Sequence, residues 1–210
     1  PGKIILTGEH AVLYGAPALI CAINRHVKIH CHSPSTHQEA TCNILLPNSR
    51  YSLTPKQCAL DHQAAHPEIA LIQHTIALFT HETQQFPSLQ LTLSSDLPIG
   101  CGFGSSAALI LALLKALFTY YNLDETQLYP LALQAENFQH GQSSGADIFT
   151  SYHGGCWIFQ KNHQAISFHL PPTLPFYTFN SGPSPQPTSD CVKQTQKTLL
   201  NAISNNEHLY

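Results

Sequence analysis

Short apolar stretches alternate with glycine-containing turns along the first part of the chain. Residues 4–6 and 18–32 are rich in β-branched side chains and flank a turn region at 8–15, so we predict strands at both places. Residues 43–46 predict a further short strand. Residues 89–93 read LQLTL, an alternation that is typical of a strand with one side in water.

Longer apolar periods predict helices in the middle of the chain. Residues 62–81 carry apolar side chains at the mixed spacing of three and four that an amphipathic helix requires. A glycine-rich turn at 96–104 leads into the apolar stretch 107–121, which predicts a buried helix. Asp124 followed by Gln127 resembles a capping box and predicts the start of another helix.

The last part of the chain predicts shorter elements. A helix ending near residue 154 is followed by a predicted strand at 156–159. Residues 169–187 are rich in proline and strand-like, and residues 191–204 predict a final helix. Helices and strands therefore mix along the whole chain.

Composition narrows the classes of protein that this pattern allows. The chain has 210 residues, of which 43% are hydrophobic and 10% charged, which excludes a disordered chain and predicts one large domain or one domain plus a fragment. Nine Lys and Arg residues stand against twelve Asp and Glu residues, so no clustered basic excess is expected. Nucleic acid is therefore not an expected partner.

Nothing in the sequence predicts a membrane segment or a secreted protein. No apolar run reaches the ~18–20 residues of a spanning helix, because Lys115 interrupts the stretch 107–121. The opening PGKIILTGEH has no basic leader or cleavage site. The seven cysteines are odd in number and form no CxxC pair. We therefore expect reduced thiols and a cytoplasmic location.

The segment PIGCGFGSSAA, residues 98–108, has the composition of a phosphate-binding loop. Gly100, Gly102 and Gly104 permit positive φ angles that expose backbone N–H groups, and the helix that follows adds its positive end. The segment lacks the lysine of a P-loop. A plain turn before a helix has the same composition, so both interpretations stay open at this point.

Charged residues gather in two other segments. PGKIILTGEHAVLYG, at residues 1–15, carries Lys3, Glu9 and His10, whereas ENFQHGQSSGAD begins with Glu136 and ends with Asp147. A turn that brings two carboxylates together suits phosphoryl transfer, in which one holds a metal and the other accepts the hydroxyl proton. Taken alone, a lysine or histidine in such a segment is more often solvated or structural, and two acids at this spacing are more often a surface feature than a site.

These three segments, in this order, resemble the motifs of the GHMP small-molecule kinases, and most closely those of the mevalonate kinases. Two positions differ from the pattern: Phe103 replaces a leucine, and Ser143 replaces a proline, which is expected to loosen the turn. The resemblance spans nearly all of residues 1–155 and continues more weakly over 180–192. It implies an α+β, two-domain fold with the active site in the cleft.

The resemblance also implies domain limits. Residues 1–168 would form the N-terminal ATP-binding domain, a ribosomal-protein-like α/β domain. Residues 169–210 would begin a ferredoxin-like C-terminal domain that is incomplete here, because the family's third glycine-rich motif does not occur before Tyr210.

The nucleotide and the metal are assigned by the same resemblance. The positions implied in ATP binding are Pro98, Gly100, Gly102, Gly104, Ser105 and Ser106. Ser106 and Glu136 would bind Mg²⁺. Simple N-capping of the helix is the alternative role of Ser105 and Ser106.

The remaining implied roles concern the acceptor. Asp147 would be the catalytic base, and Lys3 would lie close to the acceptor hydroxyl and the γ-phosphate. Glu9, His10 and Thr188 would lie on the substrate side, although a helix N-cap explains Thr188 equally well.

The implied activity is ATP- and Mg²⁺-dependent phosphorylation of mevalonate at its C5 hydroxyl. A homodimer is one oligomeric state that the sequence leaves open. Another GHMP kinase, such as phosphomevalonate kinase, would need a basic pocket, for which Arg25, Lys28 and Arg50 are the spare cations. Two further possibilities stay open: a catalytically impaired nucleotide- or metabolite-binding module, and a purely structural domain.

Overall fold

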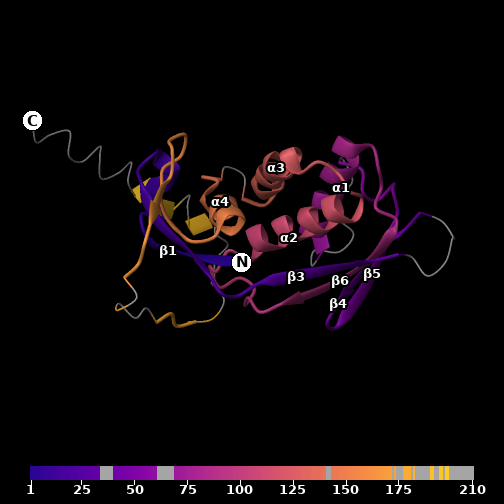
Figure 1. The fold of residues 1–210 in the computed structure, drawn as a ribbon, viewed down its shortest axis with the longest axis horizontal. Coiled ribbons are helices and arrows are strands. Elements are labelled where there is room, and N and C mark those ends of the chain that lie inside the picture. The colour runs from indigo at the N-terminus through magenta and orange to yellow at the C-terminus, as the bar shows by residue number, and fades with distance from the viewer. Residues whose placement is uncertain are drawn as a thin grey trace, which may run out of the picture.

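Figure 1 presents the fold as a computed structural model. The structure describes residues 1–33, 40–60, 69–140, 143–171 and 177–180, and the positions 173, 182, 190–191, 194–195 and 197–198. Its strands form two four-stranded sheets, which we call the first and second sheet.

The first sheet joins the start of the chain to a much later segment. Its strands, in spatial order and each antiparallel to the next, are β1 (Gly2–Thr7), β2 (Ala18–Ile23), β7 (Cys156–Phe159) and β8 (Ile166–Phe168). Lys3 lies opposite Ala22 in this register, and Cys21 lies opposite Cys156. Only β2 therefore separates the strand that carries Lys3 from β7, which follows Asp147 closely in sequence.

The second sheet has a mixed topology. Its spatial order is β3 (Val27–His32), β6 (Leu89–Ser95), β4 (Cys42–Leu46) and β5 (Ser49–Leu53). The pair β4·β6 is parallel, and the other two pairs are antiparallel. On β6 the residues Leu89, Leu91 and Leu93 are buried, and those between them are less so, which confirms the alternation predicted from LQLTL.

The helices pack over the second sheet, and α4 lies next to the first sheet (Figure 1). They are α1 (Ala70–Thr83), α2 (Ser105–Tyr120), α3 (Leu128–His140) and α4 (Ala146–His153), with short 3₁₀ helices η1 (Ala11–Tyr14) and η3 (Glu125–Gln127). Among the described helices, none has both the length and the apolar character needed to cross a membrane.

Two apolar clusters form the core. The larger lies between the second sheet and α1–α3, and α2 supplies Ile110, Leu113, Leu114 and Leu117, all fully buried. The smaller lies on the first sheet and joins Val12, Ala18, Ile20, Ala146 and Phe159. Because Ala146 belongs to α4, the smaller cluster fixes that helix against β2.

Most predicted elements are present, with some boundary differences. The strand at 156–159 is confirmed, and the single stretch 18–32 is divided into β2 and β3. Positions 62–68 of the first predicted helix lie outside the described residues, but α1 covers the rest. Asp124 caps η3 by accepting a hydrogen bond from the N–H of Thr126 at 3.2 Å, so α3 begins only afterwards.

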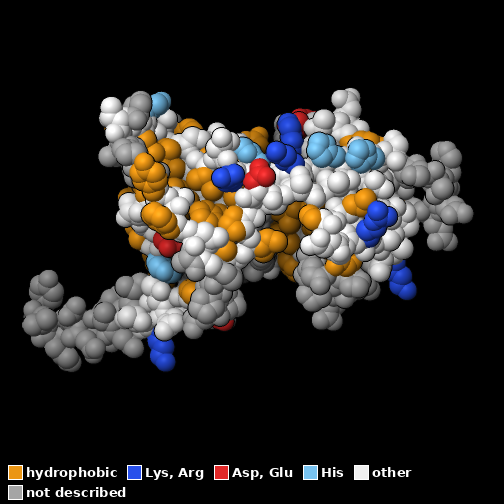
Figure 2. Space-filling view, turned by 90° about the horizontal axis from the view of Figure 1, so that it is seen from below, with side chains coloured by type: hydrophobic (Ala, Val, Ile, Leu, Met, Phe, Trp, Pro, Cys, Tyr) orange, Lys and Arg blue, Asp and Glu red, His pale blue; other side chains and the backbone are white. Residues whose placement is uncertain are grey.

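The strand-like interpretation of 169–187 is wrong where the structure describes it. Residues 169–171 and 177–180 form no strand. The last described strand of the chain, β8, ends at Phe168, just before this stretch. Ile158 and Ile166, opposite each other on β7 and β8, are 38% and 62% exposed. Apolar side chains gather at this end of the face in Figure 2.

Candidate active site

The glycine-rich loop between β6 and α2 has a backbone conformation that favours glycine. Gly100, Gly102 and Gly104 all have positive φ angles, of 72°, 78° and 67°. Gly104 occupies the N-cap of α2, and no side chain caps this helix. The backbone N–H groups of the first turn have no partners within the helix, so this end suits a phosphate.

N-capping by Ser105 or Ser106 is therefore wrong as an alternative. Both residues lie inside the first turn of α2, one and two positions after the cap, and both are half-buried. Gly104 takes the cap position because its left-handed conformation is open to glycine and costly for serine.

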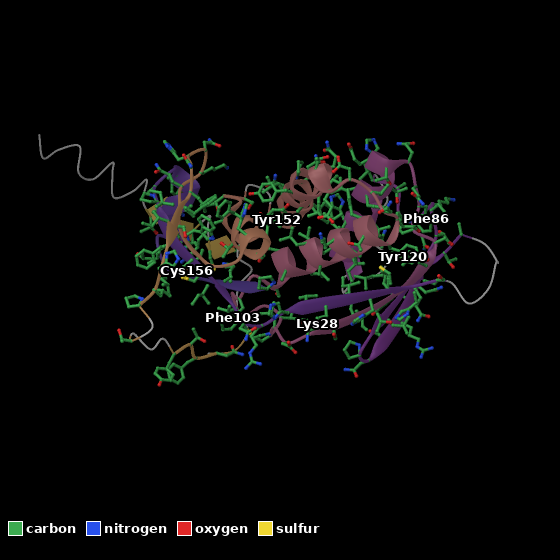
Figure 3. All side chains as sticks on the ribbon, viewed as in Figure 1. Lys28, Phe86, Phe103, Tyr120, Tyr152 and Cys156 are labelled. Carbon is green, nitrogen blue, oxygen red and sulfur yellow. The ribbon has the colours of Figure 1, made fainter. Side chains whose placement is uncertain are left out.

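The loop lies directly on β1. The backbone N–H of Lys3 donates to the carbonyl oxygen of Phe103 at 2.9 Å, and Figure 3 places Phe103 beneath the start of α2. A Cβ on Gly104 would lie 2.8 Å from Cγ of Lys3. Only glycine at this position lets the aliphatic stem of Lys3 cross the loop.

Lys3 forms an ion pair with Asp147. Its Nζ lies 3.0 Å from Oδ1 of Asp147, and the two side chains are 7% and 26% exposed. Asp147 lies in the first turn of α4, after Gly145, which has a φ of 82° at the N-cap. The Asp147 carboxylate therefore lies at the positive end of α4 as well as beside the Lys3 ammonium.

A second carboxyl group, Glu136 on α3, is only 1% exposed. Its Oε2 accepts a hydrogen bond of 2.6 Å from the hydroxyl of Ser143. Burial, and then the charge of Asp147, raise the pKa of Glu136 to about 7, while Ser143 and Lys3 act in the opposite direction. The site therefore holds two mutually repelling acids beside one lysine.

The oxygen donors here fit a magnesium ion. Mg²⁺ prefers one or two carboxylates together with substrate phosphates, and a cation would offset the repulsion between Glu136 and Asp147. Within the described residues, no group of three or more His, Cys, Asp or Glu side chains is placed to bind a metal.

The sequence-based expectation for Ser143 is wrong, because the structure shows a residue that ties the turn together. Besides its bond to Glu136, its hydroxyl accepts from the N–H of Gly145 at 3.0 Å. Its own N–H donates to Oδ1 of Asn137 at 3.1 Å, and its carbonyl accepts from Nζ of Lys161 at 3.0 Å. The sequence marks Ser143 as unusual only because it replaces the proline of the resembled motif. Nothing in the sequence indicates that Lys161 contacts this turn.

The predicted substrate-side residues are not brought to the ion pair by any contact in the described part of the chain. Glu9 is exposed and His10 half-buried, in the turn between β1 and η1. Pro98 is half-buried and precedes Gly100 in the loop. Thr188 lies outside the described residues. The structure thus joins Lys3, Asp147, Glu136 and the glycine-rich loop into one group.

A protein-family model matches the part of the chain that carries most of this group. Residues 70–155 match the model described as the GHMP kinases N terminal domain. The match includes the glycine-rich loop, Glu136 and Asp147, whereas Lys3 lies before it.

Curated relatives agree with the family model. The chain is 33% identical over 166 residues to a mevalonate kinase of Archaeoglobus fulgidus, covering 78% of this chain and 52% of the relative. It is 30% identical over 189 residues to a mevalonate kinase of Thermococcus sibiricus, covering 87% and 57%. The chain thus spans about half the length of the curated relatives it matches.

Solved structures share the fold. The mevalonate kinase of Methanococcus jannaschii aligns with a TM-score of 0.71 at 26% identity, over 80% of this chain and 54% of that one. The galactokinase of Lactococcus lactis aligns with a TM-score of 0.71 at 17% identity, over 98% and 56%, which shows likeness of fold alone. The expected α+β fold is confirmed.

Proposed function

Because this chain belongs to the GHMP kinase family, we propose that it is an ATP-dependent kinase that phosphorylates mevalonate at its C5 hydroxyl, giving 5-phosphomevalonate and ADP. The observation that carries the proposal is the ion pair of the buried Lys3 with Asp147, at 3.0 Å, next to the glycine-rich loop. The mevalonate kinase names of the relatives at 30% and 33% identity support the choice of acceptor.

The transfer needs a base, a positive charge and a cradle for phosphate. Asp147 accepts the proton of the acceptor hydroxyl while the oxygen of that hydroxyl forms a bond to the γ-phosphorus of ATP. The bond between the γ-phosphorus and the oxygen that leaves with ADP breaks. Lys3 stabilises the charge that develops on the transferred group. Backbone N–H groups from Gly102 to Ser106 hold the phosphates of ATP.

Magnesium, held by Ser106 and Glu136, would neutralise phosphate charge when bound. Glu9 and His10 would orient polar groups of the acceptor, and Thr188 would join them from the later segment. We also propose the division into an ATP-binding domain at 1–168 and the start of a C-terminal domain at 169–210. The free cysteines of the described chain suit a reducing compartment such as the cytoplasm.

Replacement of Asp147 by asparagine tests the assigned base. The amide keeps the volume of the carboxylate but cannot accept a proton, so kcat should fall about 10²–10⁴-fold, while ATP binding measured by calorimetry should change little. Glu82→Gln is the matched control, because Glu82 is an exposed acid on α1. Full activity of Asp147→Asn would remove Asp147 from this role.

A comparison of acceptors separates the mevalonate kinase from a phosphomevalonate kinase and from a binding module. Turnover with mevalonate but not with 5-phosphomevalonate supports the proposal, and the reverse preference supports a phosphomevalonate kinase. A second phosphate would need nearby cations. Lys28 Nζ lies 3.9 Å from Oδ2 of Asp96, and Arg50 lies on β5, at the edge of the second sheet. ATP binding without any turnover would identify a nucleotide-binding module.

A further inference from the structure

We propose that Ser143 and Lys161 are positioning residues that aim the Glu136 carboxylate at the divalent cation. The inference rests on the proposed function, since it gives Glu136 a metal to bind. Neither residue is expected to contact ATP or the acceptor. Both would act through the geometry of the turn that follows α3.

The hydrogen bonds of Ser143 fix the direction of its hydroxyl proton. The backbone N–H of Gly145 can only donate, and it reaches the Ser143 oxygen at 3.0 Å. The hydroxyl proton is therefore directed to Oε2 of Glu136, at 2.6 Å. Glu136 is 1% exposed, so this bond replaces one that water would otherwise provide.

This arrangement orients the carboxylate as a metal ligand. With Oε2 engaged by Ser143, rotation of the carboxyl group about its last bond is restricted, and Oε1 keeps a defined direction. Hydrogen-bonded partners of this kind commonly tune metal affinity by 10–100-fold.

Lys161 anchors the turn from a different part of the fold. It follows β7, and its Nζ donates to the Ser143 carbonyl at 3.0 Å. The neighbouring Gln160 donates from Nε2 to the carbonyl of Gly15 at 2.7 Å, which fixes this segment to the turn after η1. Ser143 is thus held through its N–H, its hydroxyl and its carbonyl.

A proline at position 143 could not support this network. It has no N–H for Asn137 and no hydroxyl for Glu136 or Gly145, so only the carbonyl bond to Lys161 would remain. The serine therefore gives this chain a means of positioning Glu136 that the proline of the resembled motif does not supply.

Binding of Mn²⁺ in the presence of ADP, followed by electron paramagnetic resonance, tests the proposal without requiring turnover. Ser143→Ala should weaken Mn²⁺ binding about 10–100-fold, and Ser143→Thr should restore it because threonine keeps the hydroxyl. Ser144→Ala is the matched control: the Ser144 hydroxyl accepts from the N–H of Ala146 at 3.2 Å, and its loss should leave Mn²⁺ affinity near the wild-type value.

Lys161→Met and Lys161→Arg form a second pair in case Ser143→Ala fails to fold. Lys161→Met should weaken Mn²⁺ binding and raise the Mg²⁺ concentration needed for half-maximal turnover, whereas Lys161→Arg should not. Unchanged Mn²⁺ affinity in Ser143→Ala or, if that variant is unfolded, in Lys161→Met would overturn the inference. A wild-type protein that binds Mn²⁺ with ADP but does not phosphorylate mevalonate would contradict the proposed function instead.

Discussion

At the scale of single residues, the site depends on a buried lysine that pairs with Asp147 and whose charge also acts on Glu136. Lys3 is 6% exposed, and a charge so far from water is tolerated only with a close partner, which Asp147 provides at 3.0 Å. Glu136 lacks a comparable ion pair and relies on a hydroxyl group. The two acids therefore differ in their partners: Asp147 has the ion pair with Lys3, and Glu136 has the hydrogen bond from Ser143.

Because the pKa of Glu136 is raised, we predict that its contribution to the free energy of unfolding falls as the pH rises, whereas that of most carboxylates increases. Its folded pKa of about 7 lies above the ordinary value of 4.5, so the folded protein binds a proton that the unfolded chain releases between these values. The contribution of protonated Glu136 to the free energy of unfolding is complete below pH 4.5 and is lost as the pH rises through 7. The total loss in the free energy of unfolding is roughly 3 kcal/mol.

Urea unfolding with EDTA present measures this effect. The wild-type protein should lose stability between pH 5 and pH 7 relative to Glu136→Gln, whose side chain does not titrate. A difference between the two proteins that is the same at both pH values would contradict the prediction.

At the scale of elements, the glycine-rich loop and β1 behave as one unit. The loop touches β1 through the Phe103 carbonyl and through the stem of Lys3. A change in the loop therefore alters the position of the ammonium group that pairs with Asp147.

Two alanine substitutions in the loop separate backbone strain from this contact. Gly102 and Gly104 both have positive φ angles, but a Cβ on Gly102 meets nothing within 4 Å, whereas one on Gly104 would lie 2.8 Å from Lys3 Cγ. Gly102→Ala should cost about 1–2 kcal/mol from strain alone, and Gly104→Ala on the order of 1–3 kcal/mol more. Thermal melts without nucleotide test this prediction, and equal losses would show that Lys3 moves aside freely.

Elements that bury one clear apolar face can be predicted from the sequence. The leucines of β6 and the apolar length of α2 are of this kind, because burial of each depends on its own periodicity. The strand β5 reads SRYSL and has only two apolar side chains, and β8 has three residues, so both are too short in apolar pattern to be predicted from the sequence. Their pairing with β4 and β7 is a tertiary effect that overrides local composition.

The same distinction applies to the candidate site. Lys3, Glu136 and Asp147 can be predicted because their motifs are local, and the structure places them together. Lys161 cannot be predicted, since its only described role is a bond to a carbonyl eighteen residues earlier. The chemistry of Ser143 also depends on a neighbour, Gly145, whose N–H directs its proton.

At the scale of the whole molecule, the two apolar clusters predict unequal local stability. The larger cluster surrounds α2, and the smaller one consists of a few side chains on the first sheet. Native-state hydrogen exchange should therefore find the slowest amides in α2 and β6 and faster ones in β7 and β8. Equal protection in both sheets would mean that the molecule opens only as one unit.

The order of strands in the first sheet has a consequence for the newly made protein. The strand β2 pairs with β1 on one side and with β7 on the other. Both β1 and β2 therefore leave the ribosome well before β7, which covers the free edge of β2. At typical rates of synthesis this interval is on the order of ten seconds. During that time the edge of β2 is unpaired, and Lys3 has no Asp147 to pair with. The ion pair forms only after α4 has been synthesised, and the edge of β2 is covered only after β7 has been synthesised.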